Sequence, residues 1–390
     1  MKVYIMVRDG FPYGMAATNR VICYAKGLIA NGIPCEVIVV RRTEVYGKPI
    51  LNLHAQGSYQ NIPFRYIGGH TQRSKSRFCR VISDWLDVFR IWKFCQTGTE
   101  SSDVILNYLR EDRLNWFILN AAHRNKVKVI RELCEYPYGG KRECSDKTLK
   151  RIFKKFDGFI VISEALKKVA EKYKSEKARI IKVPILVNES RFEEGTEKVN
   201  VGVPYLFHAG TLTEYKDAVI STLKAFIIAV NEIKIPVKYL LAGPVSPHKK
   251  EIEGLLYEHK IENRVIFLGN LKPSEVIKYQ KGAFLTVVNK NDNIQNRYGF
   301  STKLGEILWS GTPVITTTVG EANYYLKDGE SAYIVEPHNP RLIAEKIIQA
   351  FSNPEESRKI AEAGKKIAQD SFNCLSQGKR LASFFSSFSF

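Results

Sequence analysis

The stretch YGFSTKLGEILWSGTPVITTTVGEA, residues 298–322, combines a turn, a helix and a buried strand in direct succession. Its Gly/Ser/Thr turn opens a helical pattern that ends at Ser310-Gly311, because glycine commonly terminates a helix. The run TPVITT (312–317) then has the apolar, β-branched composition of a buried parallel strand. A helix that leads directly into such a strand predicts a doubly wound α/β sheet.

The same alternation runs through the whole second half of the chain. Apolar runs separated by helical patterns predict strands at 205–210, 237–243, 263–269, 283–288 and 312–317. Helices are expected at about 340–351 and 355–368. We therefore predict a Rossmann-like domain over residues 204–372.

The first half repeats this organisation and predicts a second Rossmann-like domain over residues 1–190. Its strands are expected at 3–7, 35–40, 103–108, 127–132, 158–163 and 178–184. Residues 191–203 are polar and aperiodic, as in a linker, and the segment 373–390 is expected to cross back to the first domain. Open α/β domains bind ligands at the carboxyl ends of their strands, so two such domains should face a ligand-binding cleft.

The 390-residue chain has a formal net charge of +19, and most of it lies in the first half. Residues 1–190 carry 34 Lys and Arg against 18 Asp and Glu, a net charge of +16. Such a surplus indicates an acidic partner, either nucleic acid or an anionic membrane surface, or else serves solubility alone. The chain lacks the aromatic and basic signatures of the common RNA-binding modules, so we expect no nucleic-acid partner.

A basic, aromatic segment in the first half favours the membrane interpretation. The segment QRSKSRFCRVISDWLDVFRIWKFC (72–95) places Phe78, Ile82, Trp85, Phe89 and Trp92 at helical spacing among arginines and lysines. A second basic group lies at Lys147, Lys150, Arg151, Lys154 and Lys155. The alternative is a core-facing helix with a solvated basic rim.

No apolar run is long enough to span a bilayer, and charged residues follow the N-terminus too closely for a signal peptide. The seven cysteines are scattered and form no CxxC pair, which argues against disulfides or a zinc site. We expect a cytoplasmic protein that lies peripherally on the inner face of the plasma membrane.

The helix that begins near Ser301 is a candidate anion site. Free backbone N–H groups at Ser301 and Thr302, the positive end of the helix and the Lys303 ammonium suit a diphosphate. Glu306 lies on the same helical face and can accept hydrogen bonds from ribose hydroxyls. The alternative is an ordinary helix start with Glu306 in a surface ion pair.

A second candidate phosphate loop, FHAGTLTEYKD (207–217), leaves the first strand of the same domain. Gly210 permits close approach of the backbone to phosphate, and Lys216 follows six residues later. The chain contains neither a GxxxxGK[ST] P-loop nor a GxGxxG fingerprint.

These stretches resemble the group-1, family 4 type retaining glycosyltransferases of the GT-B fold. The resemblance covers Gly14 to Leu28, SEAL (163–166), VPILVNESRF before the linker and FSTKLGE…SGTPVI, and it is strongest from 205 to 337. It implies an α/β fold of two Rossmann-like domains and a nucleotide-sugar donor bound by the second.

Carried over by position, the resemblance implies a set of donor-binding residues. These are Gly14, His208, Gly210, Thr211, Lys216, Asn289, Tyr298, Phe300, Ser301, Thr302, Lys303 and Glu306. Two of them depart from the family pattern, because Thr211 replaces an Arg and Tyr298 replaces the first Glu of E-x7-E. Asn289, Asp292, Asn293 and Asn296 are candidates for the lost contacts to the donor sugar.

The implied chemistry is sugar transfer with retained anomeric configuration, in which the departing nucleoside diphosphate must be stabilised. Lys216 and Lys303 fit that catalytic role, and Glu135 is a candidate acceptor-side base together with Glu132. Because these cations replace a metal ion and no DxD follows a strand, we expect no metal and no cofactor beyond the nucleotide-sugar co-substrate.

The acceptor is expected to be a glycan or a polyprenyl-linked glycan of bacterial surface polysaccharide or glycolipid synthesis. Three other functions stay open: an inverting GT-B transferase, a UDP-sugar epimerase, and a silent paralogue that binds nucleotide-sugar without transferring it. The anomeric configuration of the product would identify an inverting transferase. Activity without an acceptor would identify an epimerase, and binding without turnover would identify a silent paralogue.

Overall fold

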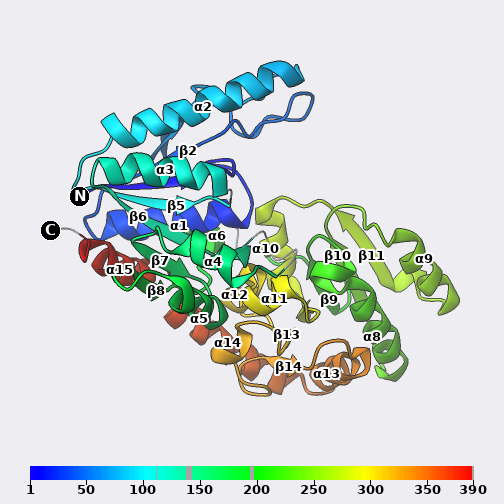
Figure 1. The fold of residues 1–390 in the computed structure, drawn as a ribbon. Helices are drawn as coiled ribbons and strands as arrows, with labels where there is room; N and C mark the ends of the chain where they lie inside the picture. Colours follow the sequence, from blue (N-terminus) through cyan, green and yellow to red (C-terminus); the bar gives the residue numbers. More distant parts are fainter. Residues whose placement is uncertain (111, 138–142, 194–196, 389–390) are drawn as a thin grey trace. The chain divides into compact units, whose positions relative to one another are not determined.

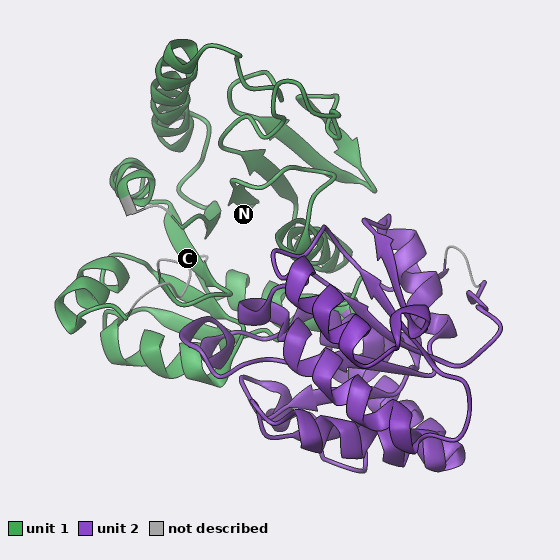
Figure 2. Ribbon diagram, turned by 90° about the vertical axis from the view of Figure 1, so that its right-hand side faces the viewer, with its two compact units in different colours: residues 1–188, 374–390 green, residues 189–373 purple. Residues whose placement is uncertain are grey.

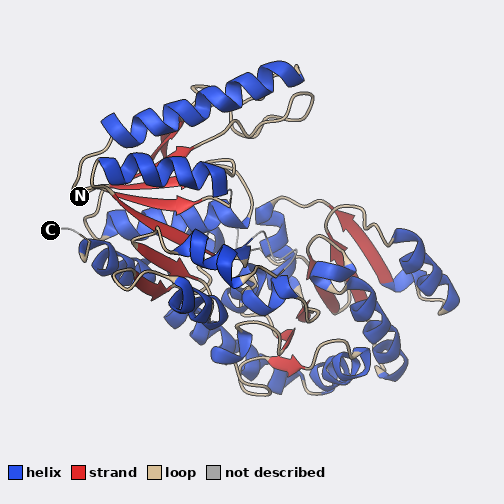
Figure 3. Cartoon of the chain, viewed as in Figure 1, coloured by secondary structure: helices blue, strands red, loops and turns tan. Residues whose placement is uncertain are grey.

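The computed structural model describes residues 1–110, 112–137, 143–193 and 197–388, which fold into two compact units (Figures 1 and 2). Unit 1 comprises Met1–Asn188 and Cys374–Phe390, and unit 2 comprises Glu189–Asn373. In each unit helices pack on a sheet (Figure 3). The α/β fold of two Rossmann-like domains is therefore confirmed.

Unit 1 is built on an eight-stranded sheet with the order β3-β4-β2-β1-β5-β6-β7-β8. The strands pair in parallel, except that β3 is antiparallel to β4. They are β1 Val3–Val7, β2 Cys35–Val39, β3 Gln56–Tyr59, β4 Ile62–Tyr66, β5 Val104–Tyr108, β6 Lys128–Leu133, β7 Gly158–Val161 and β8 Arg179–Lys182. The central strands β1 and β5 are buried along their whole length and are mostly apolar, as is typical of strands covered on both faces.

The first five helices of unit 1 connect these strands, and the last helix, α15, follows unit 2 in the chain. They are α1 Ala16–Ala30, α2 Arg77–Thr97, α3 Asp112–Arg124, α4 Asp146–Phe153, α5 Glu164–Tyr173 and α15 Cys374–Ser386. Although α15 follows unit 2 in the chain, it packs against α1. The two helices cross at glycines: a Cβ atom on Gly378 would lie 2.3 Å from Cα of Gly27.

Unit 2 is built on a six-stranded parallel sheet with the order β11-β10-β9-β12-β13-β14. Its strands are β9 Tyr205–Ala209, β10 Lys238–Ala242, β11 Val265–Gly269, β12 Leu285–Val288, β13 Val314–Thr317 and β14 Tyr333–Val335. Its helices are α6 Ser190–Glu193, α7 Glu214–Asp217, α8 Val219–Glu232, α9 Lys249–Glu258, α10 Pro273–Gly282, α11 Ile294–Tyr298, α12 Thr302–Ser310, α13 Pro340–Ser352 and α14 Pro354–Ser371. Two short 3₁₀ turns, η2 Glu262–Arg264 and η3 Ala322–Tyr324, complete it.

Every strand expected from an apolar run is present, whereas β3, β4 and β14 were not expected. The missed strands lack a long apolar run: β3 is largely exposed, and β14 has three residues. The hairpin of β3 and β4 turns through Gln60 and Asn61, whose φ angles of 49° and 64° suit a two-residue turn. Asn tolerates this conformation, but Gln gives little sequence signal for it.

The segment 191–203, expected as a linker, lies within unit 2. It begins in α6, and farther along the backbone N–H of Val199 donates to the carbonyl of Lys278 (3.3 Å). Residues 194–196 lie outside the described part of the chain.

Helix α2 is divided between a packed half and an exposed half. Its second half buries Ile91, Phe94 and Cys95. The stretch 78–89 leaves six apolar side chains exposed, Phe78, Val81, Ile82, Trp85, Leu86 and Phe89. No helix in the described residues is both long and apolar enough for a membrane span.

Candidate functional site

The topology of unit 2 marks one place on its sheet for a ligand. From β9 the chain adds β10 and β11 on one side, and then crosses to add β12, β13 and β14 on the other. The two directions of winding separate between β9 and β12, and such switch points form ligand-binding crevices at the carboxyl ends of the strands. The loops after β9 and β12 carry the polar residues described below.

Gly210 lies at the end of β9, where the backbone passes close to other site groups. A Cβ atom at this position would lie 2.5 Å from Nζ of Lys303 and 2.7 Å from Oδ2 of Asp217. Any larger residue would therefore displace the ion pair between these two side chains. The resemblance predicted Gly210 as a phosphate-loop residue, and the structure places it against the site cations.

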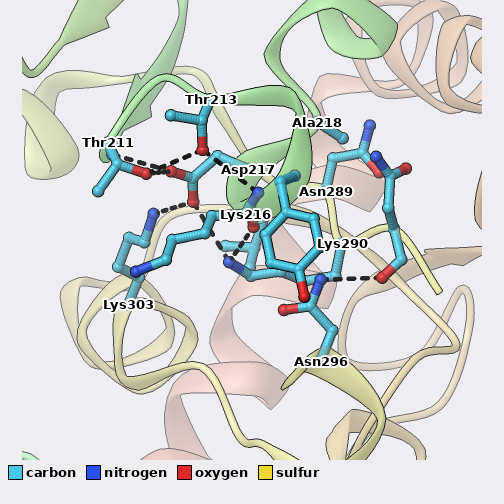
Figure 4. A network of polar contacts seen from close by, with 12 residues as sticks. Thr211, Thr213, Lys216, Asp217, Ala218, Asn289, Lys290, Asn296 and Lys303 are labelled. Carbon is cyan, nitrogen blue, oxygen red and sulfur yellow. Dashed lines mark hydrogen bonds and ion pairs between the residues drawn. The ribbon is translucent and has the colours of Figure 1, made fainter. Parts of the chain in front are cut away.

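Asp217, the last residue of α7, is the centre of the polar network in Figure 4. Its Oδ1 accepts from Nζ of Lys303 (2.5 Å) and of Lys290 (3.2 Å). Its Oδ2 accepts from the backbone N–H (2.8 Å) and the hydroxyl (2.6 Å) of Thr211. Only 3% of Asp217 is exposed, so this carboxylate is satisfied by protein groups.

Lys303, in the first turn of α12, reaches across to the loop after β9. Besides Asp217 it donates to the carbonyl oxygen of Ala209 (3.1 Å), next to Gly210. Ser301 is the N-cap of α12 and Thr302 its first residue, so the backbone N–H groups of the first turn and the Lys303 ammonium lie at the same helix end. The structure thus joins the two predicted phosphate loops.

The residues after β12 mainly hold loops together. Nδ2 of Asn291 donates to the carbonyl oxygen of Glu214 (2.9 Å), and Nδ2 of Asn293 donates to that of Tyr215 (2.9 Å). Asn289 is buried and donates to the Thr222 hydroxyl (3.1 Å). These bonds tie the loop after β12 to α7 and α8.

The predicted ribose ligand Glu306 is already paired in this structure. Its Oε1 accepts from Nη1 of Arg191, which lies in α6, and both side chains are partly buried. The ion-pair alternative considered from the sequence is therefore present. The second carboxylate oxygen is the one that a ribose hydroxyl would approach.

Three other predicted donor-site residues occupy different surroundings. His208 is 2% exposed, and its Nδ1 bonds to the Tyr239 hydroxyl (3.0 Å). Phe300 is buried and stacks on Tyr325 with ring centroids 5.5 Å apart. Tyr298, the last residue of α11, is half-buried.

The charges of the network shift its pKa values. Burial would raise the pKa of Asp217, but the ammonium groups of Lys303 and Lys290 hold it well below its usual range. Burial and then the charge of Lys303 lower the pKa of Lys290 to about 8. Burial lowers the pKa of His208 to about 4, so this imidazole is neutral at pH 7.

The unit 1 candidates lie at the carboxyl ends of its own strands. Gly14 is in the loop after β1, where a Cβ atom would lie 2.1 Å from the hydroxyl of Thr18. Glu135 follows β6 and pairs with Arg110 (3.0 Å). Glu132 is unsuited to be an acceptor-side base, because its fully buried carboxylate accepts from Arg20 (2.8 Å) and Tyr24 (2.9 Å).

Sequence reasoning missed two of the central residues, Asp217 and Lys290. Asp217 directly follows the predicted phosphate ligand Lys216 in the sequence YKD. Lys290 lies two residues beyond the end of β12, where a charged residue after a buried strand is itself a signal.

Comparison with known families gives a match over unit 2. The model of "Glycosyl transferases group 1" matches residues 190–367, nearly all of unit 2. The chain is 25% identical over 209 residues to the D-inositol 3-phosphate glycosyltransferase of Corynebacterium urealyticum, covering 50% of this chain and 48% of that protein. It is 28% identical over 146 residues to the trehalose synthase of Pyrococcus horikoshii, and this match covers 36% of this chain and 34% of that protein. These matches span less than half of each relative.

Solved structures resemble the whole chain. Sucrose-phosphate synthase from Thermosynechococcus elongatus superposes with a TM-score of 0.73 at 17% identity, covering 99% of both chains. Anabaena HepE in complex with UDP-glucose superposes with a TM-score of 0.69 at 15% identity, covering 99% of this chain and 100% of that one. Residues 190–367 thus resemble the group 1 glycosyl transferases, and the chain has the GT-B fold of these solved structures.

Proposed function

We propose that this protein is a retaining glycosyltransferase that moves a sugar from a nucleotide-sugar to an acceptor. The observation that carries the proposal is the cluster of Lys303, Lys290 and Asp217 at the N-terminus of α12. It lies where the strand order of unit 2 reverses. Two ammonium groups and a helix N-terminus at such a point suit the diphosphate of a nucleotide.

In this proposal the cations stabilise the departing nucleoside diphosphate. The developing negative charge is greatest in the transition state, so fixed positive groups accelerate the transfer. Asp217 is bound by two lysines and by Thr211, which makes it a positioning residue for the cations rather than a nucleophile. We propose that transfer needs no metal ion, since the lysines and the helix end supply the positive charge.

Other predicted residues enter with narrower roles. Lys216 is proposed as a further phosphate ligand, and Glu306 is proposed to bind ribose with the oxygen opposite its Arg191 contact. Gly14 is proposed as a further donor-binding residue. Glu135 is proposed as an acceptor-side base.

The donor is tested first by binding. Anabaena HepE has been crystallised with UDP and UDP-glucose, which makes uridine nucleotides the first probes. We expect one class among UDP-, GDP-, ADP- and CMP-sugars to raise the melting temperature with EDTA present. Lys303→Met should abolish most of this shift, whereas Lys359→Met, at an exposed residue of α14, should leave it unchanged.

Turnover then separates the proposal from its alternatives. Retention predicts a product whose anomeric configuration, read by NMR, equals that of the donor sugar. Inversion of configuration would identify an inverting transferase. Sugar interconversion without an acceptor would identify an epimerase, and binding without any turnover a silent paralogue. If no nucleotide-sugar binds, the donor-site proposal is wrong.

For the acceptor we propose a glycan carried on a membrane lipid, as in bacterial surface polysaccharide or glycolipid synthesis. The supporting observation is the stretch 78–89 of α2, where Trp85 is 66% exposed among five other exposed apolar residues. Lys75, Arg77 and Arg80 are exposed beside them. Apolar and basic groups together suit the interface of an anionic membrane, at whose inner face we place the protein.

Vesicle sedimentation tests this surface. The protein should bind phosphatidylglycerol vesicles and bind phosphatidylcholine vesicles much less, and salt should weaken the binding. Replacing Trp85 and Phe89 together by Ser should reduce binding at least tenfold, since both aromatic side chains insert in this proposal. Replacing exposed Tyr257 of α9 by Ser is the control. Equal binding to both vesicle types would contradict the proposal.

A further inference from the structure

Lys290 is held in the site by two protein oxygens. Its Nζ donates to the carbonyl oxygen of Lys216 (2.7 Å) and to Oδ1 of Asp217 (3.2 Å). An ammonium group has three N–H donors, and within the described residues these two bonds occupy two of them. Its side chain is 17% exposed, so a ligand at the site can reach it.

The charged groups that act on Lys290 lie in α7 and α12. Lys303 of α12 and Asp217 of α7 are its nearest charged neighbours, and Lys216 of α7 adds a further positive charge. Glu214 directs its Oε2 to the backbone N–H of Ile220 (2.7 Å), at the start of α8. His208 of β9 is neutral at pH 7, because burial lowers its pKa to about 4.

The charges therefore do not balance in the unliganded protein. The ammonium groups of Lys303 and Lys216 act on that of Lys290, and Asp217 is the carboxylate that Lys290 and Lys303 share. Asp217 cannot neutralise both of its lysines, since one carboxylate carries a single negative charge. A bound anion would supply the missing negative charge and take up the remaining donor of Lys290.

We propose that Lys290 is a third cation for the diphosphate of the donor and that nucleotide binding is coupled to proton uptake at this residue. The inference rests on the proposed function, because it assigns a further ligand to the same donor site. It adds a residue outside the motifs by which the chain resembles its family.

The coupling follows from the electrostatics of the free site. Burial and Lys303 lower the pKa of Lys290 to about 8, so near this pH about half of the molecules carry a neutral amine there. A diphosphate next to the amine favours its charged form and raises the pKa again. Nucleotide affinity should therefore fall as the pH rises beyond 8, where binding must first protonate Lys290.

Isothermal titration calorimetry with UDP measures this coupling directly. The titration is run at pH 8.5 in two buffers that differ in ionisation enthalpy, since the difference in binding heat gives the number of protons taken up. At pH 8.5 about three quarters of the free molecules carry the neutral amine, so we expect an uptake of roughly 0.5–0.75 proton per bound UDP for the wild type. GDP and inorganic pyrophosphate serve as second probes, because the coupling depends on the diphosphate rather than on the base.

Three variants identify the group that titrates. Lys290→Met should weaken UDP binding at pH 7 about tenfold or more and abolish the proton uptake. Lys290→Arg keeps a permanent positive charge, so it should retain binding at pH 7 and still lose the uptake. Lys359→Met should behave like the wild type in both respects. If Lys290→Met fails to fold, the proton uptake of Lys290→Arg tests the proposal, and its loss would identify Lys290 as the group that titrates.

The outcomes separate this inference from the proposed function. A wild type that binds none of UDP, GDP and pyrophosphate would overturn both. A wild type that binds UDP, with a proton uptake that persists in Lys290→Arg, would overturn the role of Lys290 alone and leave the donor site standing.

Discussion

A carboxylate with two ammonium partners explains why several residues of the proposed donor site depend on one another. Asp217 is almost fully buried and accepts four hydrogen bonds, from Thr211, Lys290 and Lys303. Removal of one partner from a buried ion pair leaves an uncompensated charge, which costs more than the pair itself contributes. The stability and the ligand affinity of unit 2 should both respond to this one side chain.

Asp217→Asn should destabilise the protein without changing the shape of residue 217. The two lysines would lose their counter-ion, and we expect the free energy of unfolding to fall by about 3 kcal/mol. UDP or pyrophosphate should restore part of it by replacing the lost negative charge. Denaturant unfolding with and without these ligands measures both effects. Glu355→Gln, in an exposed pair with Lys359, is the control, and equal losses in the two variants would contradict the prediction.

His208 should make unit 2 sensitive to acid. Its pKa is lowered by burial to about 4, whereas an unfolded histidine titrates near 6.5. As the pH falls through this window, the unfolded state binds the proton first, so stability decreases. Between pH 7 and pH 5 the loss should be about 2 kcal/mol. His208→Gln keeps a polar partner for Tyr239 and should remove this part of the pH dependence; an unchanged slope would contradict the assignment.

At the scale of elements, two helices far apart in the chain depend on a pair of glycines. Helix α15 returns to unit 1 and packs on α1, where Gly27 and Gly378 bring the two backbones together. A Cβ atom on Gly27 would lie 2.6 Å from Cα of Gly378, so neither position has room for a side chain. The return of the chain therefore requires small residues in both helices.

Gly378→Ala should lower the stability of unit 1 by about 1–3 kcal/mol, because the added methyl group forces the helices apart. Thermal unfolding measures the loss, and limited proteolysis should cut near α15 sooner than in the wild type. Gly254→Ala in α9 is the matched control, since no atom lies within 4 Å of its Cβ position. Because alanine has a higher helix propensity than glycine, Gly254→Ala should leave the free energy of unfolding unchanged or raise it. Equal effects of both substitutions would contradict the crossing.

At the scale of the whole molecule, each unit has a hydrophobic core of its own. The core of unit 1 includes residues of α15. The largest core of unit 2 is formed by residues between Leu206 and Ile360. Separate cores favour separate cooperative transitions. Gly378→Ala then marks the transition of unit 1, and Asp217→Asn marks that of unit 2.

Differential scanning calorimetry should resolve two transitions. Gly378→Ala should lower one of them and Asp217→Asn the other, and UDP should raise only the one that Asp217→Asn lowers. A single transition that moves with every substitution would show instead that the two units unfold together.

Much of this architecture was accessible from the sequence alone. Buried strands such as 3–7 and 205–209 are short apolar runs between turn residues, and their pattern depends on local composition. The helix start at Ser301 and the loop at Gly210 carry local signals for the same reason. The fold class and the two candidate phosphate loops therefore followed from the order of residues along the chain.

The tertiary structure alone decided which of these residues meet. Asp217 contacts Lys290 and Lys303 across 73 and 86 positions of sequence, and no local pattern records such a contact. The pairing of Glu306 with Arg191 likewise spans 115 positions. Burial depends on the packing of several elements, and pKa values depend on burial and on charges brought close by folding. For this reason the sequence could predict the loops of the site, whereas the ion pairs that connect them became visible only in the folded chain.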